Sequence, residues 1–218
     1  MKINLLDCTL REAPINGLVL GKNYIKKFIK ALESANVDII ECGFLKNLPH
    51  NPDSTIFQYV EEIEPYLQNK KAGTLYVALV DYGRYDLKYL SDYDGKSIDG
   101  IRICFKKDER FKVFEYAKAI KDKGYKVFFQ NVDTMSYSDI ELLEVIEKVN
   151  ELKPYAYSIV DTFGAMYAED LRHIYSIVNH NLDKDIILGF HAHNNLMLAN
   201  ANTQEFVNLA CNEREINI

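Results

Sequence analysis

The strongest chemical signal in this sequence is a pair of histidines one residue apart. His191 and His193 follow an apolar run at 186–188 that ends at Gly189. Side chains alternate along a strand, so we expect the two imidazoles to project from the same face. Two imidazoles on one face can hold a divalent metal ion, whereas the plainer alternative is a half-buried pair with satisfied nitrogens. We therefore take this strand end as half of a candidate metal site.

A second group of charged residues lies near the N-terminus. Arg11 and Glu12 are adjacent, and Glu41 ends the next apolar run. We expect Glu12 to complete the metal site with the two histidines. The ligands would then be a mixed set of nitrogen and oxygen atoms, which suits Mn, Mg, Co or Zn. Arg11 and Glu41 are expected to be either a buried ion pair between neighbouring strands or part of the catalytic machinery.

Short apolar or β-branched runs alternate with segments of helical periodicity along the chain. Val113, Ala117 and Ile120 share one helix face, and Gly124 follows as a C-terminal stop. This alternation predicts an α/β protein with a parallel sheet. Strands are expected at 3–10, 37–44, 74–81, 98–105, 125–132, 155–161 and 186–191, and the start of another at 215–218. Helices are expected at 24–35, 55–66, 111–123, 139–152, 169–178 and 195–208.

Two architectures fit this alternation, an open doubly wound sheet and an eight-stranded barrel. The first strand-to-helix connection has no glycine-rich phosphate-binding motif, which weakens the dinucleotide-binding form of the open sheet. Polar residues end six of the expected strands, among them Asn131 and Asp161. Functional groups at strand C-termini are typical of a barrel's active face. We therefore predict an α/β (β/α)8 TIM barrel forming one catalytic-type domain over 1–218, with Asp161 and Asn131 contacting substrate. Capping of the following helix is the alternative role for Asp161.

The expected eighth strand has few residues, so we predict a barrel truncated at the start of that strand. A barrel that does not close leaves sheet edges exposed. We therefore expect strands one and seven to have unpaired edges. The chain is then expected either to derive from a longer parent or to cover the gap by self-association as a homo-oligomer.

Composition limits the classes of partner. The formal net charge of -6 argues against a nucleic-acid partner, and the apolar runs are too short to cross a membrane. The four cysteines show no paired spacing, and the first residues do not have the pattern of a signal peptide. We expect a reduced, cytoplasmic protein.

Four short motifs, in this order, resemble those of a superfamily of metal-dependent TIM-barrel lyases and synthases. They are DCTLRE at 7–12, DIIECGF at 38–44, DTFG at 161–164 and HAHNN at 191–195. The superfamily includes 4-hydroxy-2-oxovalerate aldolase, HMG-CoA lyase and isopropylmalate synthase. The chain looks closest to the aldolase-like proteins with a pyruvate carboxyltransferase-type domain.

The resemblance implies a divalent-metal-dependent aldolase or lyase that cleaves or forms a carbon–carbon bond next to a small 2-oxo acid. By this likeness Arg11 stabilises a developing enolate oxygen and Glu41 supports it. His191 and His193 match the metal-binding histidines, and Asp161 matches a polar position that faces the same pocket.

The chain departs from the superfamily pattern in its first motif. Glu12 and Ala13 stand where the superfamily has aspartate and glycine, and Ile15 stands where close aldolases have a histidine base. Two alternatives therefore stay open. One is a catalytically silent barrel relative with a binding or assembly role. The other is a synthase that condenses an acyl-CoA with a 2-oxo acid.

Overall fold

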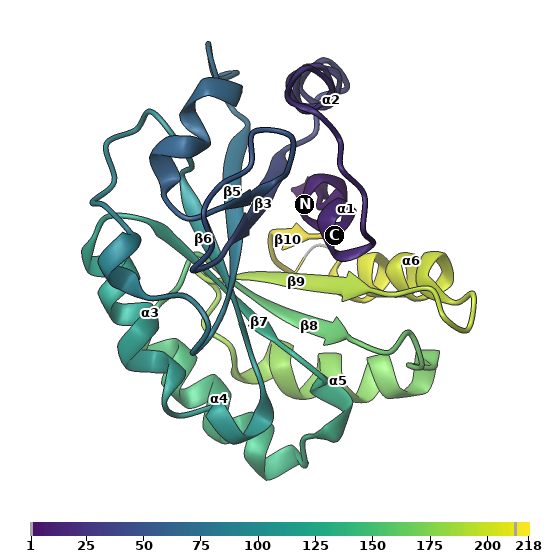
Figure 1. The fold of residues 1–218 in the computed structure, drawn as a ribbon. Helices are drawn as coiled ribbons and strands as arrows, with labels where there is room; N and C mark the ends of the chain where they lie inside the picture. Colours follow the sequence, from purple (N-terminus) through teal and green to yellow (C-terminus); the bar gives the residue numbers. More distant parts are fainter. Residues whose placement is uncertain (1, 212) are drawn as a thin grey trace. The chain divides into compact units, whose positions relative to one another are not determined.

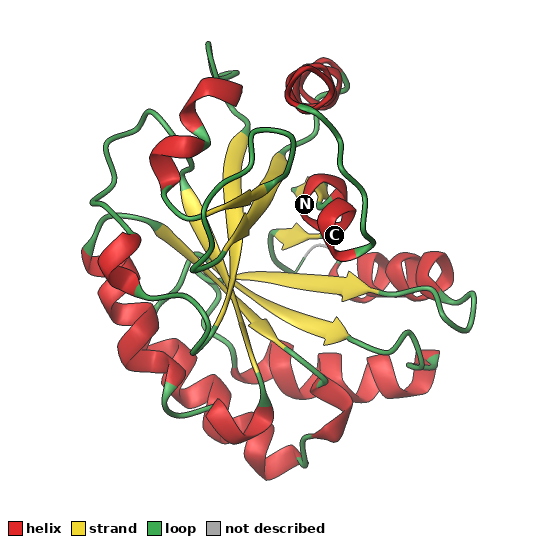
Figure 2. Cartoon of the chain, in the orientation of Figure 1, coloured by secondary structure: helices red, strands yellow, loops and turns green. Residues whose placement is uncertain are grey.

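Short strands and helices alternate along the chain, as Figure 1 shows by sequence order and Figure 2 by secondary structure. The structure is a computed structural model and describes residues 2–211 and 213–218. Its internal contacts divide the chain into two compact units. Unit 1 comprises Met1–Asn4, Cys104–Lys118 and Phe128–Ile218, and unit 2 comprises Leu5–Ile103 and Ala119–Val127. The single domain over 1–218 stays a prediction.

The sheet of unit 2 is built from apolar parallel strands. β3 (Ile39–Leu45) is buried at every position, which is typical of a parallel strand covered on both faces. It pairs with β2 (Leu6–Asp7), with β4 (Ile56–Phe57) and with β5 (Leu75–Asp81). β6 (Gly100–Phe105) follows β5 in the strand order. β3, β5 and β6 agree with the expected strands to within a few residues, whereas β4 lies in a segment that was expected to be helical.

The first expected strand, 3–10, is much shorter in the structure. It is divided into two-residue strands and ends at Asp7. The Asp7 carboxylate then accepts hydrogen bonds from the backbone N–H and the hydroxyl of Thr9, where helix α1 begins. Because short acidic side chains stabilise such turns, the chain leaves the sheet earlier than the apolar pattern predicts.

The expected helix at 55–66 is wrong. This segment is β4 followed by two 3-10 turns, and Pro65 lies in the second turn. Proline has no N–H to continue a helical ladder. The Glu62 carboxylate also accepts hydrogen bonds from the backbone N–H groups of Gln58 and Tyr59, which closes the first turn. The helical elements of unit 2 are α1 (Thr9–Ile15), α2 (Lys22–Ser34), η1 (Val60–Glu62), η2 (Glu64–Tyr66) and η3 (Leu87–Tyr89).

Unit 1 contains a second set of parallel strands. β7 (Lys126–Asn131), whose first residues belong to unit 2, pairs with β8 (Ala156–Asp161), and β8 pairs with β9 (Ile187–Ala192). β10 (Ile216–Asn217) pairs with β9 and with β1 (Ile3–Asn4). All of these pairs are parallel.

The short strand β10 changes one expectation. Ile216 pairs with Leu188 of β9 on one side and with Ile3 of β1 on the other. The expectation that the first and seventh strands have unpaired edges is therefore wrong at these residues. Two residues are enough to pair both edges, because Ile216 and Asn217 each have a partner on β1 and another on β9.

The helices of unit 1 follow the periodicity of the sequence. The helix at 139–152 has the predicted bounds because Ser138 caps it: the Ser138 hydroxyl accepts from the Glu141 N–H, and the Glu141 carboxylate accepts from the Ser138 N–H. The helical elements are η4 (Lys107–Glu109), α3 (Val113–Asp122), which runs into unit 2, η5 (Thr134–Ser136), α4 (Asp139–Leu152), α5 (Ala168–Asn181) and α6 (Ala199–Ala210). Among the described residues, no helix has the length and apolar character needed to span a membrane.

Candidate functional site

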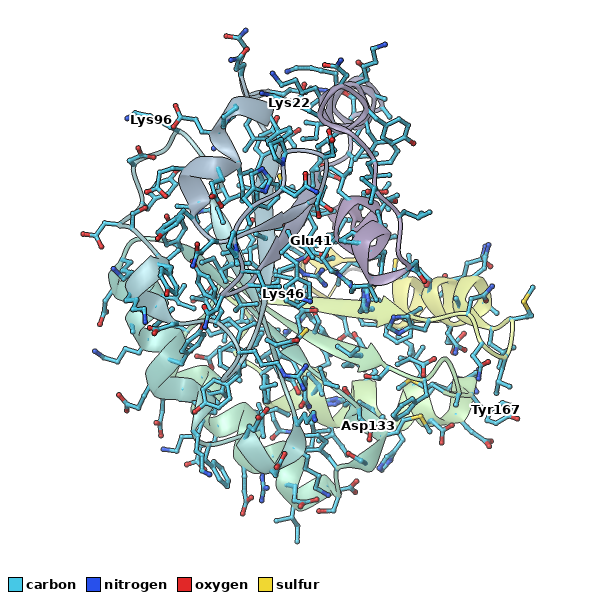
Figure 3. The ribbon with its side chains drawn as sticks, viewed as in Figure 1. Lys22, Glu41, Lys46, Lys96, Asp133 and Tyr167 are labelled. Atoms are coloured by element: carbon cyan, nitrogen blue, oxygen red, sulfur yellow. The ribbon has the colours of Figure 1, made fainter. Side chains whose placement is uncertain are left out.

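A buried carboxylate held by two guanidinium groups forms the charged centre of unit 2. Glu41 lies on β3, beside α1 (Figure 3), and is completely buried. Its Oε2 accepts a hydrogen bond from Arg11 Nε at 2.9 Å, and its Oε1 accepts one from Arg102 Nη1 at 2.7 Å. A buried carboxylate needs such partners, because leaving it unpaired costs several kcal/mol. The ion pair expected between Arg11 and Glu41 is present.

Arg102 is a second cation of this site, and the sequence motifs did not assign it. Its side chain is only 3% exposed, although it lies within the apolar run of β6. A buried arginine needs an acidic partner, so an arginine inside an apolar run was the signal in the sequence that a buried acid lies nearby. The sequence did not identify Glu41 as the acid, because the pairing spans 61 residues of chain.

Arg11 and Glu12 lie on α1 rather than at a strand end. Leu10, Arg11 and Ala13 make up the buried side of this helix, which brings Arg11 to Glu41. Glu12 is partly exposed, and its carboxylate forms an ion pair with Arg11 Nη1. The Glu12 carboxylate is therefore already engaged by a cation within its own unit.

The electrostatics of this cluster keep Arg11 charged. Burial by itself lowers the pKa of Arg11, but the adjacent Glu41 carboxylate more than offsets burial and raises that pKa above its ordinary value. The same surroundings act on Cys8, which precedes α1: burial, and then the charge of Glu41, raise the pKa of its thiol. The cluster combines a permanent cation with a thiol that stays protonated.

The two histidines lie together in unit 1. His191 is on β9 and His193 follows its last residue, and their ring centroids are 4.9 Å apart. Both side chains are half-buried. His193 Nδ1 is 2.8 Å from the backbone carbonyl oxygen of Asp161, an acceptor, so Nδ1 carries the hydrogen. This contact leaves His193 Nε2 as the ring's lone-pair donor, the arrangement found when a histidine binds a metal.

Asp161 has a different position from the predicted one. In the register of β8 and β9, Asp161 pairs with Ala192 and Val160 pairs with His191. The Asp161 side chain is therefore on the face opposite that of His191. Its Oδ1 accepts hydrogen bonds from the backbone N–H groups of Ala165 and Met166, at 3.0 and 3.3 Å. Asp161 thus holds the loop before α5, which resembles the helix-capping role that the sequence left as the alternative. This position gives no support to the predicted contact between its side chain and a substrate.

Asn131 is likewise directed away from the histidine face. It is fully buried at the end of β7 and is in register with Ile159. Its Nδ2 donates to the hydroxyl of Tyr157 at 2.9 Å, and its backbone carbonyl accepts from the Thr134 hydroxyl. The first contact joins β7 to β8 and the second holds the loop after β7, and they give no support to the predicted contact with substrate.

The donor chemistry of the histidine pair suits a metal ion, although the pair supplies only two ligands. Within the described part of unit 1, no third His, Cys, Asp or Glu side chain lies close enough to form a metal-binding group with them. Glu12 belongs to unit 2, and its joining His191 and His193 stays a prediction.

Comparison with known protein families finds a match over part of the chain. The sequence profile described as HMGL-like matches residues 102–213, slightly more than half of the chain. The chain is 28% identical over 219 residues to homocitrate synthase from Sulfolobus acidocaldarius, which covers 93% of this chain and 44% of that protein. It is 26% identical over 212 residues to 4-hydroxy-2-oxovalerate aldolase 2 from Salinispora arenicola, covering 93% and 59%. The chain thus spans roughly half the length of the curated relatives it matches.

Solved structures share the fold. The N-terminal domain of a putative aldolase from Bacteroides vulgatus superposes with a TM-score of 0.75 and 19% identity, covering all of this chain and 72% of that one. Together with the alternating parallel strands and helices of the two units, this likeness confirms the predicted TIM-barrel class.

Proposed function

This chain belongs to the HMGL-like family, and on that basis we propose that it is a divalent-metal-dependent lyase of the aldolase type. It cleaves or forms a carbon–carbon bond next to a small 2-oxo acid, one carbon away from the 2-oxo carbonyl. The similarity to 4-hydroxy-2-oxovalerate aldolase 2 supports a lyase of the aldolase type. The observation that carries the proposal is the histidine pair, with one ring oriented by a backbone carbonyl.

His191 and His193 are the protein ligands of the metal in this proposal. Because the Asp161 carbonyl occupies Nδ1 of His193, that ring presents Nε2, and the neighbouring ring of His191 is close enough to share an ion. A divalent ion held by these two rings would supply Lewis acidity toward the carbonyl of a 2-oxo acid. Glu12, which forms an ion pair with Arg11 in its own unit, stays the third ligand that the sequence predicts.

Arg11 is the electrostatic partner of the reaction. Its charge is held by Glu41, and its Nη1 contacts only the partly exposed Glu12 among the hydrogen bonds that the described residues show for it. A guanidinium donor directed at an oxygen that gains negative charge stabilises the transition state more than the ground state. Glu41 and Arg102 act as positioning residues, because Glu41 is completely buried and holds the Arg11 side chain from the side away from solvent.

A condensing synthase is the second candidate. The match to homocitrate synthase favours it, since the chain aligns with that protein over most of its own length at 28% identity. The same residues serve both directions of carbon–carbon chemistry, because each direction passes through an electron-rich carbon next to a polarised carbonyl. In this case an acyl-CoA is the second substrate.

Metal content of the protein tests the proposal. We expect protein purified without chelator and dialysed against MnCl2 to retain manganese, and the His191→Ala variant to lose it. His180→Ala is the matched control, because His180 is exposed on α5 and its hydrogen bonds within the described residues are to Ser176 of its own helix. Equal manganese in His191→Ala and wild type contradicts the proposal. A folded wild type without any bound metal favours the catalytically silent alternative.

Activity then separates the two candidates. Wild-type protein with manganese is incubated with 4-hydroxy-2-oxo acids to detect cleavage, and with acetyl-CoA and 2-oxo acids to detect release of free thiol. Cleavage supports the lyase, whereas thiol release supports the synthase. The Arg11→Lys variant should lose most of the activity in either assay while it keeps its metal, because lysine does not reproduce the two-sided contacts of Arg11.

A further inference from the structure

Gly164 ends the DTFG motif and lies, buried, in the turn that follows β8. Its φ is +58°, a conformation that favours glycine because a Cβ raises its energy. A second requirement is steric. A Cβ at this position would lie 2.5 Å from the backbone nitrogen of Asn195 and 2.9 Å from the carbonyl carbon of His193. Because these are backbone atoms, any larger residue at position 164 must displace the chain that follows His193.

The Asp161 carbonyl oxygen connects Gly164 to the His193 ring. This oxygen accepts a hydrogen bond from the Gly164 N–H at 3.1 Å and another from His193 Nδ1 at 2.8 Å. The Gly164 carbonyl in turn accepts a hydrogen bond from the Leu196 N–H at 3.0 Å. The turn at 161–164 therefore contacts the segment after β9 at both His193 and Leu196, and all of these residues belong to unit 1.

The segment after β9 has few other contacts that fix its position. The side chains of residues 194–197 are exposed. Among the described residues, their other hydrogen bonds stay within the segment or reach Ala199, the first residue of α6. Exposed side chains contribute little packing, so the backbone contacts with the turn at 161–164 set the position of this segment.

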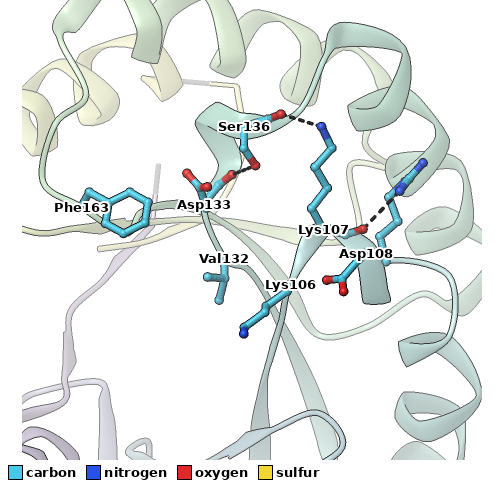
Figure 4. Close-up of a pocket in the computed structure, with 8 residues that line it drawn as sticks. Lys106, Lys107, Asp108, Val132, Asp133, Ser136 and Phe163 are labelled. Carbon is cyan, nitrogen blue, oxygen red and sulfur yellow. Dashed lines mark hydrogen bonds between the residues drawn. The ribbon is translucent and has the colours of Figure 1, made fainter.

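The two central side chains of the turn are directed toward other loops. The Phe163 ring lines a cavity of about 450 Å³ together with residues of the loops after β6 and β7 (Figure 4). The Thr162 hydroxyl accepts a hydrogen bond from the Asp133 N–H at 2.7 Å. The close approach to the segment after β9 is therefore made at Gly164, where a side chain has no room.

We propose that Gly164 is a positioning residue for His193. The hydrogen atom in place of a side chain lets the segment after β9 lie against the turn, and this contact keeps His193 Nδ1 on the Asp161 carbonyl and His193 Nε2 available to a metal. The inference rests on the proposed function, in which His193 is a metal ligand.

The first test needs no metal. In metal-free protein at about pH 8 the imidazole rings are neutral, and long-range proton–nitrogen NMR correlation reports which ring nitrogen carries the hydrogen. The His193→Gln variant identifies the His193 signals among those of the five histidines. Wild type should show only the Nδ1–H form of His193. Gly164→Ala should show both forms, because the displaced backbone no longer holds Nδ1 against the Asp161 carbonyl.

Manganese affinity is the second readout. Titration with MnCl2, followed by the electron paramagnetic resonance signal of the free ion, gives the dissociation constant. Gly164→Ala should bind manganese about tenfold more weakly than wild type, which is a typical loss when a group that orients a metal ligand is changed.

Gly83→Ala is the matched control. Gly83 lies in the turn after β5, has a φ of +75° and is exposed, and a Cβ there would have no described atom within 4 Å. Alanine at this position meets the same backbone strain without the close contact. We expect Gly83→Ala to keep the single Nδ1–H form of His193 and a manganese affinity within about twofold of wild type.

Three results overturn the proposal: an unchanged His193 ring in Gly164→Ala, an unchanged manganese affinity in Gly164→Ala, or equal effects in Gly83→Ala. If Gly164→Ala does not fold, hydrogen exchange in the wild type decides. The Leu196 N–H should then exchange at least about tenfold more slowly than the Asn195 N–H, for which the described residues show no acceptor. Equal exchange of the two amides overturns the proposal.

The two readouts separate failure of this inference from failure of the proposed function. If wild type binds no manganese while Gly164→Ala still gives both ring forms, the metal-dependent function fails and the positioning of His193 by Gly164 stands. If wild type binds manganese, His191→Ala loses it and Gly164→Ala changes nothing, the proposed function stands and the role of Gly164 fails.

Discussion

His193 and Asp161 are joined through a side-chain nitrogen and a backbone oxygen: His193 Nδ1 donates to the Asp161 carbonyl at 2.8 Å. The Asp161 side chain turns the other way and accepts from the loop before α5. The backbone carbonyl of Asp161 therefore orients the His193 ring, and any residue at this position would supply that carbonyl. The Asp161 carboxylate stabilises the loop before α5. The two roles can be separated by substitution.

We expect Asp161→Ala to lower the free energy of unfolding by about 1–3 kcal/mol, because one buried and one partly buried backbone N–H group lose their acceptor. Asp161→Asn keeps an oxygen at Oδ1 and should stay close to wild type in urea unfolding. Loss of activity in Asp161→Asn with normal stability would instead assign the carboxylate to substrate.

Removal of the Glu41 carboxylate should be among the costliest single changes in the protein. We expect Glu41→Met to destabilise by about 3 kcal/mol or more, because two buried guanidinium groups lose their counter-charge. Adding Arg102→Met should restore part of that loss, since it removes one of the unpaired charges. Glu61→Gln, at an exposed position, is the control and should change unfolding by less than about 0.5 kcal/mol. Additive effects of the Glu41 and Arg102 changes would contradict this account.

A close contact between β8 and β9 requires glycine at position 189. A Cβ there would overlap the Ser158 hydroxyl. We expect Gly189→Ala to cost about 1–3 kcal/mol of stability through overpacking. Ser158→Gly opens the space, so the double variant should be more stable than the sum of the two single changes predicts. Thermal unfolding of the four proteins completes the cycle, and strict additivity would rule out the clash.

The cysteines should differ in their rates of alkylation. Cys211 is exposed, whereas Cys42 is buried and burial raises the pKa of its thiol. Burial and the charge of Glu41 raise the pKa of Cys8. A raised thiol pKa means less thiolate at any given pH, so at about pH 8 iodoacetamide should modify Cys211 first. Rising pH should increase the rate at Cys8, and peptide mapping by mass spectrometry measures each site. Modification of Cys8 before Cys211 would contradict the inferred burial and charge.

Much of the architecture could be predicted because it depends on local patterns. The apolar runs and helical stripes placed most strands and helices within a few residues, and Ser138 and Glu141 set the start of α4. The segment 55–66 failed because Pro65 and the contacts of Glu62 override an apparent periodicity. The two-residue strand β10 was underestimated because its pairing with β1 joins the two ends of the sequence.

The sequence by itself determined that His191 and His193 share a face, because alternation along one strand is a local property. It also placed Arg11 and Glu41 within reach as an ion pair. Only the tertiary structure decided that Arg102 completes that pair and that Asp161 and Asn131 point away from the histidines. The physical reason is strand register: it joins residues far apart in the chain, and a difference of one position moves a side chain to the other face of the sheet.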